Sequence, residues 1–248
     1  MKNYSQSYIS KELMHFVGSS EPKGKEQYNL LIEILKSGIL TPVPKYPETS
    51  GLIEIHIDKK LSDNEVYKAD KVCFCDIPIS DIKIHMGKYS EFGVSFLKSD
   101  LITKGASPIF YIEKNSNIKL PSLFQGTKSN LSHADYFNEI HDDFRQLMAY
   151  VEQLIKNHSI MKDRDKKIKD LRKVRHFFEC HIFSFLKHFD SNLDDDDKEN
   201  YYMEREWLIL GNLEFKLADV YRIILPESYA KRFRKDMPNY SGQITFAE

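Results

Sequence analysis

The sequence has few of the features that mark secreted, membrane-spanning or disulfide-stabilised proteins. Its 248 residues include three cysteines, Cys73, Cys75 and Cys180, an odd number that is too small for a disulfide framework. We therefore expect a reducing, cytoplasmic setting. No apolar run approaches the roughly 18 residues that span a bilayer. The polar first ten residues also lack the apolar core of a secretory signal, so we expect a soluble chain without membrane contact.

An excess of charge of one sign is also missing. The 36 Lys and Arg side chains nearly balance the 37 Asp and Glu side chains, which leaves a formal net charge of -1. Overall charge therefore does not favour binding to nucleic acid, and a charged partner must be recognised locally. Glycine-rich phosphate-binding motifs and the G-x-S-x-G motif are absent. Cys73-x-Cys75 is tighter than the C-x2-C spacing of zinc sites and has no second pair, so no metal site is predicted.

Helix and strand patterns occupy both ends of the sequence. Lys25–Ser37 has apolar residues at helical spacing and is followed by Gly38, a residue typical of a helix end. A short helix is expected between Ser80 and His85, and a last helix begins at Pro226. The short β-prone runs predict strands at Leu13–Val17, Val72–Ile77, Phe92–Leu97, Pro108–Ile112, Trp207–Leu210, Leu213–Leu217, Val220–Leu225 and, at a sheet edge, Ile244–Phe246.

The middle of the chain has a different character. Asp135–Met161 predicts a long amphipathic helix, and a second helix is expected over Asp165–Phe189, basic in its first half and aromatic in its second. We therefore expect an α+β fold with a mixed or antiparallel sheet core formed by residues 1–120 and 201–248. Residues 121–200 would form a long helical-hairpin insertion. Its basic half is either a solvated face or a docking surface for another protein.

Two places in the first core segment hold candidate functional side chains. His15 lies on the first predicted strand, where it is either a core histidine with satisfied polar atoms or a polar group at a site. His85 and Tyr89 are four residues apart and share one face of a helix. They either close the core beneath a turn or hold a ligand.

A third candidate lies in the second core segment, where Glu204 and Glu206 are two residues apart. On a strand they would share one face, with Arg205 and Trp207 on the other. Two carboxylates on one face repel each other and need solvent, a cation or a substrate between them. The alternative is the solvent-facing side of an edge strand that Trp207 anchors.

Three blocks of sequence carry a family resemblance. They are HFVG at His15–Gly18 with LLIEILKSGIL at Leu30–Leu40, the segment VCFCDIPISDIKIHMGKYSEFGVSFLKSDLITKGASPIFYI at Val72–Ile112, and EREW at Glu204–Trp207. In this order they resemble AbiGi, a family of bacterial abortive-infection (antiphage) proteins. The resemblance implies phage defence, often in a two-gene system, as the antitoxin-like partner of a nucleotidyltransferase-like toxin.

A second resemblance is to the ADP-ribosyltransferases, which use a His on an early strand, a Tyr or Ser on a central strand and a Glu on a late strand. His15, Tyr89 and the Glu204-x-Glu206 pair occur in that order. The resemblance implies that NAD is bound as a substrate by His15, Tyr89 and His85. It also implies that Glu206 is the catalytic carboxylate and Glu204 its helper, acting as the nicotinamide leaves.

The sequence therefore supports more than one functional hypothesis. The leading one is an antiphage effector with an ADP-ribosyltransferase-like core that transfers ADP-ribose or hydrolyses NAD. The alternative is a non-catalytic antitoxin-like or phage-sensing protein that binds its partner through the insert helices. RNA binding or cleavage through His15, His85 and the basic helix is a third hypothesis, which the charge balance does not favour.

Overall fold

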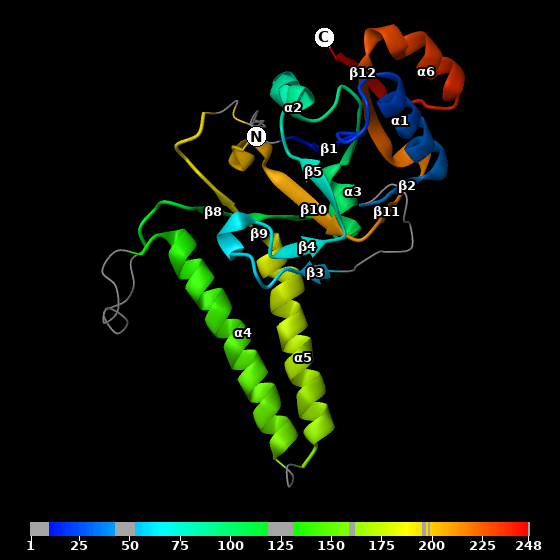
Figure 1. Cartoon of the computed structure of the whole chain (residues 1–248). Coiled ribbons are helices and arrows are strands. Elements are labelled where there is room, and N and C mark those ends of the chain that lie inside the picture. The colour runs from blue at the N-terminus through cyan, green and yellow to red at the C-terminus, as the bar shows by residue number, and fades with distance from the viewer. Residues whose placement is uncertain are drawn as a thin grey trace, which may run out of the picture. The chain divides into compact units, whose positions relative to one another are not determined.

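The computed structural model describes residues 10–42, 53–118, 131–158, 162–194, 197 and 199–247, which form two compact units (Figure 1). Unit 1 consists of Met1–Leu52, Asp70–Ile109 and Tyr201–Glu248, and unit 2 of Ile53–Ala69 and Phe110–Asn200. Unit 2 therefore contains more of the chain than the expected insertion of residues 121–200, since it also includes Ile53–Ala69 from the first expected core segment. Among the described helices, none combines the length and the apolar character that crossing a bilayer requires.

Unit 1 is built on a sheet whose described strands run in the order β13-β12-β6-β1-β5-β10-β7. All neighbours are antiparallel except β12 and β13, so the predicted α+β class with a mixed sheet is confirmed. β13 pairs at one edge, as expected. The strands are β1 (Glu12–Phe16), β5 (Lys71–Cys75), β6 (Gly93–Leu97), β7 (Ser107–Pro108), β10 (Glu206–Leu210), β12 (Val220–Pro226) and β13 (Gln243–Ala247).

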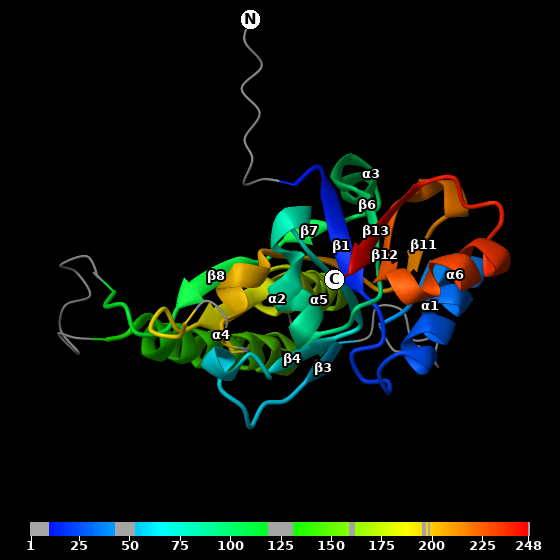
Figure 2. The ribbon, with the colours of Figure 1, turned by 90° about the horizontal axis from the view of Figure 1, so that it is seen from above.

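The helices of unit 1 are α1 (Lys25–Ser37), α2 (Ile82–Lys88), α3 (Lys98–Thr103) and α6 (Ala230–Asp236), and β2 (Ile39–Leu40) pairs with β11 (Leu213–Glu214). α1 has the predicted bounds and ends at Gly38, whose φ of 69° is the left-handed cap. α1 and α6 lie side by side (Figure 2), where the Tyr28 hydroxyl donates to Asp236 at 2.8 Å. The prediction that Pro226 begins the last helix is wrong: Pro226 ends β12, and Ala230 begins α6.

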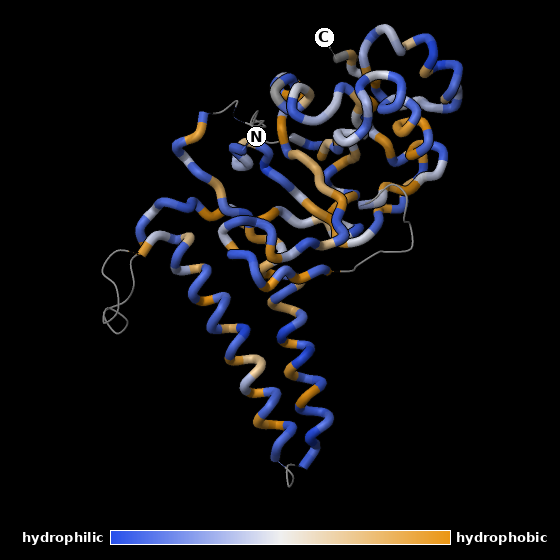
Figure 3. Tube along the Cα trace, in the orientation of Figure 1, coloured by the Kyte–Doolittle hydropathy of each residue, from blue (hydrophilic) through white to orange (hydrophobic). Residues whose placement is uncertain are grey.

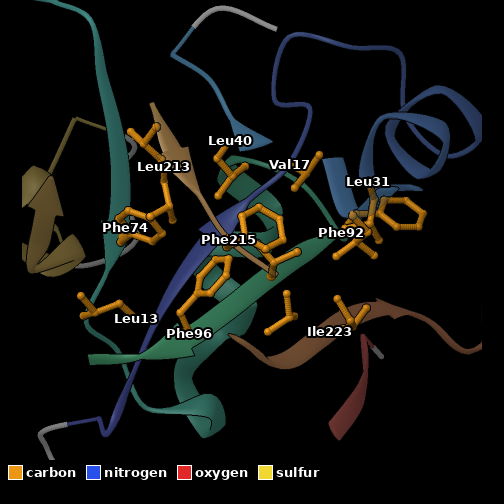
Figure 4. Close-up of a cluster of buried hydrophobic side chains, with 14 of the residues drawn as sticks. Leu13, Val17, Leu31, Leu40, Phe74, Phe92, Phe96, Leu213, Phe215 and Ile223 are labelled. Atoms are coloured by element: carbon orange, nitrogen blue, oxygen red, sulfur yellow. The ribbon is translucent and has the colours of Figure 1, made fainter. Parts of the chain in front are cut away.

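Alternation along the strands gives the sheet two faces with different neighbours. On the first, the α1 face, strand residues pack with residues of α1, β2 and the segment after β11 (Figure 4): Leu13, Phe74, Phe96 and Ile223 with Leu31, Leu40 and Phe215. On the second, the α2 face, a smaller cluster contains Met14, Phe16, Cys75, Ile77, Ile82 and Ile224. A side chain's face therefore decides which residues it can meet.

Unit 2 contains a helical hairpin and two short ladders. Its elements are β3 (Ile53–Ile55) antiparallel to β4 (Tyr67–Ala69), β8 (Phe110–Glu113) parallel to β9 (Leu186–Phe189), α4 (His133–Asn157) and α5 (Arg164–His181). The hairpin and its long first helix are confirmed. The second helix ends earlier than predicted, because Leu186–Phe189 pairs with β8 instead of continuing it. Apolar and polar residues alternate along both helices (Figure 3).

Candidate functional site

A buried polar cluster lies where α2 meets the turn before β10. We call its members, His85, Lys88, Tyr89, Glu204 and Glu206, the Glu204 cluster. Lys88 Nζ donates to Glu204 Oε1 at 2.5 Å, and the Tyr89 hydroxyl donates to the same oxygen. The Glu204 side chain is 5% exposed and that of Lys88 is 14% exposed. The carboxylate is therefore engaged by protein donors, as a buried charge must be.

The two carboxylates do not share one strand as predicted. Residues 201–204 form a 3-10 turn, and Arg205 has a φ of 47°, in the left-handed region. The strand begins only at Glu206, which pairs with Cys75 across the ladder. The alternation rule therefore does not relate Glu204 to Glu206, and the alternative of a solvent-facing edge is wrong as well, since both residues are buried.

The remaining members of the Glu204 cluster are ordered by aromatic packing. Phe16 on β1 stacks on His85 and Tyr89, with ring centroids 6.4 and 6.1 Å apart. Lys88 lies over the rings of Tyr89 and Tyr201, at 5.4 and 4.9 Å. Cation–π contacts of this kind hold the ammonium group in place beside the carboxylate.

Burial and neighbouring charge set the protonation of this cluster. Burial, followed by the charge of Glu204 and its hydrogen bond, raises the pKa of the Tyr89 hydroxyl, and Cys75 and Glu206 add to the effect. Tyr89 is therefore a protonated donor at neutral pH. Burial lowers the pKa of His85 against the opposing charge of Glu204, so this ring is neutral. Its Nδ1 has no hydrogen-bond partner within the described part of the chain.

His15 is not brought together with the Glu204 cluster. Phe16, which contacts that cluster, points to the α2 face, so its neighbour His15 points to the α1 face. There its Nδ1 bonds the Cys73 carbonyl oxygen at 2.8 Å, and its ring contacts Phe74 edge-on. His15 and Tyr89 therefore face opposite sides of the sheet.

Two further buried ion pairs in unit 1 were missed by sequence reasoning. Asp76 accepts from Lys98 Nζ at 2.7 Å and lies 3.6 Å from Arg205. Glu12 accepts both Nε and Nη2 of Arg222, at 2.9 to 3.1 Å. These partners are 22 to 210 residues apart in sequence, so no local spacing signals them. Both pairs link strands or their ends and serve the architecture of the sheet.

In unit 2, the hairpin presents an exposed apolar row on α4. The row, which we call the α4 stripe, consists of Ile140, Leu147, Tyr150 and Leu154, and these side chains are 42% to 58% exposed. Three of them are seven residues apart, a spacing that returns to nearly the same side of a helix. α5 adds exposed Val174 and Phe177. Aligned apolar side chains of this kind are a candidate surface for contact with another protein.

The basic half of α5 is partly neutralised within the hairpin. Arg172 pairs with Glu152 at 2.8 Å, and Arg175 pairs with Glu179 at 2.8 Å. Within the described residues, no ion pair is formed by the exposed lysines of the same half, which are Lys166, Lys167, Lys169 and Lys173. They leave a local positive charge on α5.

No group of three or more His, Cys, Asp or Glu side chains among the described residues is arranged to hold a metal ion. Separately from metals, unit 1 holds the buried carboxylates of Glu204 and Glu206 and the protonated hydroxyl of Tyr89, and the neutral rings of His85 and His15 face opposite sides of the sheet.

Comparison with known proteins identifies the family. The family described as "Putative abortive phage resistance protein AbiGi, antitoxin" matches residues 58–243, which are 186 of the 248 residues. The matched range includes His85, Tyr89, Glu204, Glu206 and the whole helical hairpin. Searches of curated proteins and of solved structures gave no match. The chain belongs to the AbiGi family of bacterial abortive-infection (antiphage) proteins.

Proposed function

We propose that this chain is the non-catalytic, antitoxin-type member of a two-gene abortive-infection system and that it binds its toxin protein through the α4 stripe. The observation that carries the proposal is the alignment of Ile140, Leu147 and Leu154, exposed on one side of a long helix. Burial of such residues in a partner interface removes their apolar surface from water, at about 25 cal/mol for each Å² buried. The family description as an antitoxin agrees with a protein partner.

The exposed lysines of α5, the second helix of the hairpin, suggest what the toxin contributes. Lys166, Lys167, Lys169 and Lys173 leave α5 positive. An amphipathic helix of the toxin, with an apolar row and acidic flanks, would match both features. The Glu204 cluster supports a non-catalytic role, because its carboxylates are buried and Glu204 is occupied by Lys88 and Tyr89.

The test is binding of the purified toxin by two matched variants. In Leu147→Glu/Leu154→Glu, two charges enter the stripe, and we expect the dissociation constant to rise at least about 100-fold. In Gln146→Glu/Gln153→Glu, the same charges stand one residue away at exposed positions of α4. This control should bind as the wild type does. Equal binding by the stripe variant and its control would refute the assignment of the stripe.

A second candidate function is the NAD-dependent ADP-ribosyltransferase activity implied by resemblance. It is favoured by one observation: the pair His85 and Tyr89 gathers in one cluster with the pair Glu204 and Glu206, although Tyr89 and Glu204 are 115 residues apart in sequence. Glu206 would then be the catalytic carboxylate. Incubation with NAD and extract of infected cells tests this. If wild type and Glu206→Gln behave alike in NAD turnover and in phage protection, the catalytic function is rejected.

A further inference from the structure

Unit 1 contains a cavity of about 350 Å³ beside His15, and none of the described residues that line it belongs to the Glu204 cluster. Three segments line it: the end of β1 with the following turn (residues 15–20), the second half of α1, and residues 39–42. The volume lies within the usual range for small-molecule sites. Apolar side chains, among them Val17, Leu30 and Ile34, form part of its wall.

His15 lines this cavity and carries a hydrogen-bond acceptor. Its Nδ1 is 2.8 Å from the Cys73 carbonyl oxygen. Because a carbonyl oxygen only accepts, Nδ1 carries the ring proton and Nε2 keeps a lone pair. Burial lowers the pKa of His15 against the opposing effect of this hydrogen bond, so the ring is neutral at pH 7. The structure gives Nε2 no hydrogen-bond partner among the described residues.

The rim beside His15 is a fixed turn. Gly18 has a φ of 77°, and its carbonyl oxygen accepts from the buried Gln27 side chain at 2.9 Å and from the Glu21 amide at 3.0 Å. Gln27 in turn accepts from the Gly24 amide at 3.3 Å. A side chain at position 18 would crowd Gln27, since a Cβ would come within 3.2 Å of its Cγ. The serines that follow Gly18 therefore present their hydroxyls from an ordered backbone.

The charge of the lining restricts the ligand. Glu33 is the charged side chain that lines the cavity, and none of the described residues lining it is Lys or Arg. A phosphate group would meet a carboxylate with no compensating cation, which is unfavourable. A flat, uncharged ring fits the apolar wall, and hydroxyl or amino groups on it would donate to His15 Nε2 and to Glu33.

We propose that this cavity binds a phosphate-free nucleoside, with its base against the apolar wall and its donors directed to His15 and Glu33. This site is independent of the proposed toxin interface, which lies in the other unit. It also differs from an NAD site, because NAD carries a diphosphate that the lining does not accommodate.

The test is calorimetric titration of the full chain with adenosine, guanosine, cytidine and uridine, and with the 5′-monophosphate of each nucleoside as its phosphorylated control. At least one nucleoside should bind, and its own monophosphate should bind at least tenfold more weakly. Loss of one hydrogen bond to an uncharged partner predicts that His15→Phe weakens nucleoside binding by about tenfold. Failure of all four nucleosides to bind, or equal binding of the bound nucleoside and its monophosphate, would overturn the proposal.

A charge reversal keeps the test decisive if His15→Phe does not fold. Glu33 is exposed on α1, so Glu33→Lys should fold normally and should shift preference toward the monophosphate. Glu26→Lys makes the same change at an exposed position of α1 that does not line the cavity, and its preference should equal that of the wild type. An identical shift in both variants would contradict the site.

Discussion

Lys88 illustrates how single residues determine what the buried carboxylates can do. The ammonium group is held between a carboxylate and two aromatic rings, and Glu204 takes a second hydrogen bond from Tyr89. A carboxylate bound in this way stabilises the turn that leads into β10. We therefore propose a structural role for Glu204 within unit 1.

Removal of the Lys88 charge should destabilise the folded protein. In Lys88→Met the carboxylate of Glu204 stays buried without its cation, and we expect the free energy of unfolding to fall by about 3 kcal/mol. The double variant Lys88→Met/Glu204→Gln removes both charges and should recover much of that loss. Urea unfolding monitored by circular dichroism measures both. A double variant as unstable as the single one would show that the ion pair is not the cause.

His188 in unit 2 should make the folded protein less stable at acidic pH. It is fully buried, and neither ring nitrogen has a partner among the described residues. Burial, with the charges of Lys114 and His133, lowers its pKa to about 4 against the opposing charge of Asp63. The unfolded chain, with a pKa of about 6.5, binds the proton more readily. The stabilisation from neutral His188 is therefore complete above about pH 6.5 and is lost as the pH falls toward 4.

The replacement His188→Phe should weaken this acid sensitivity. We expect the difference in unfolding free energy between pH 7 and pH 5 to become smaller than in the wild type, as measured by urea titration at both pH values. His158→Gln, at an exposed position after α4, is the control and should keep the wild-type difference. An unchanged difference in His188→Phe would assign the acid sensitivity to other groups.

At the scale of elements, two glycines show that a helix end and a helix interior differ in their need for glycine. Gly38 caps α1 with a φ of 69°, and a Cβ there would lie 2.6 Å from the Phe215 carbonyl oxygen. Gly87 lies within α2, where a Cβ would meet no atom within 4 Å. Gly38→Ala should therefore destabilise the protein by more than about 1 kcal/mol, and Gly87→Ala should stabilise it by about 0.5 kcal/mol. Thermal unfolding of both variants measures this contrast, and a loss of stability in both would contradict it.

Elements with local signals were predictable from the sequence. The bounds of α1 follow from apolar spacing and Gly38, and the long helix α4 follows from its amphipathic pattern. The end of α5 was not predictable, because Leu186–Phe189 is drawn into a ladder with Phe110–Glu113, more than 70 residues away in the sequence.

The geometry of the candidate site also depends on pairing between segments that are far apart in the sequence. The cluster of His85, Tyr89 and Glu204 agrees with residues selected from the sequence, but the face on which His15 lies does not follow from local pattern. That face is set by the register of β1 against β5 and β6. The left-handed φ of Arg205, which separates the two carboxylates, has no sequence signal, since Arg is not a residue that favours it.

At the scale of the whole molecule, unit 1 is assembled from three separate stretches of the chain. The Glu12–Arg222 pair joins the first strand to a strand near the end of the sequence. The Ile109 amide donates to the Glu206 carbonyl oxygen at 3.1 Å, so the segment 110–200 leaves and re-enters unit 1 at neighbouring strands. This topology inserts the hairpin without altering the order of the strands in the sheet.

The central claim is that the α4 stripe, and not a catalytic carboxylate, carries the antitoxin function. It is tested most directly by the growth of bacteria that express the toxin together with each variant of this chain. We expect the wild type, Gln146→Glu/Gln153→Glu and Glu206→Gln to restore growth, and Leu147→Glu/Leu154→Glu to fail although it is folded and present at the wild-type level. Restored growth with the stripe variant and failure of a folded Glu206→Gln would contradict the claim.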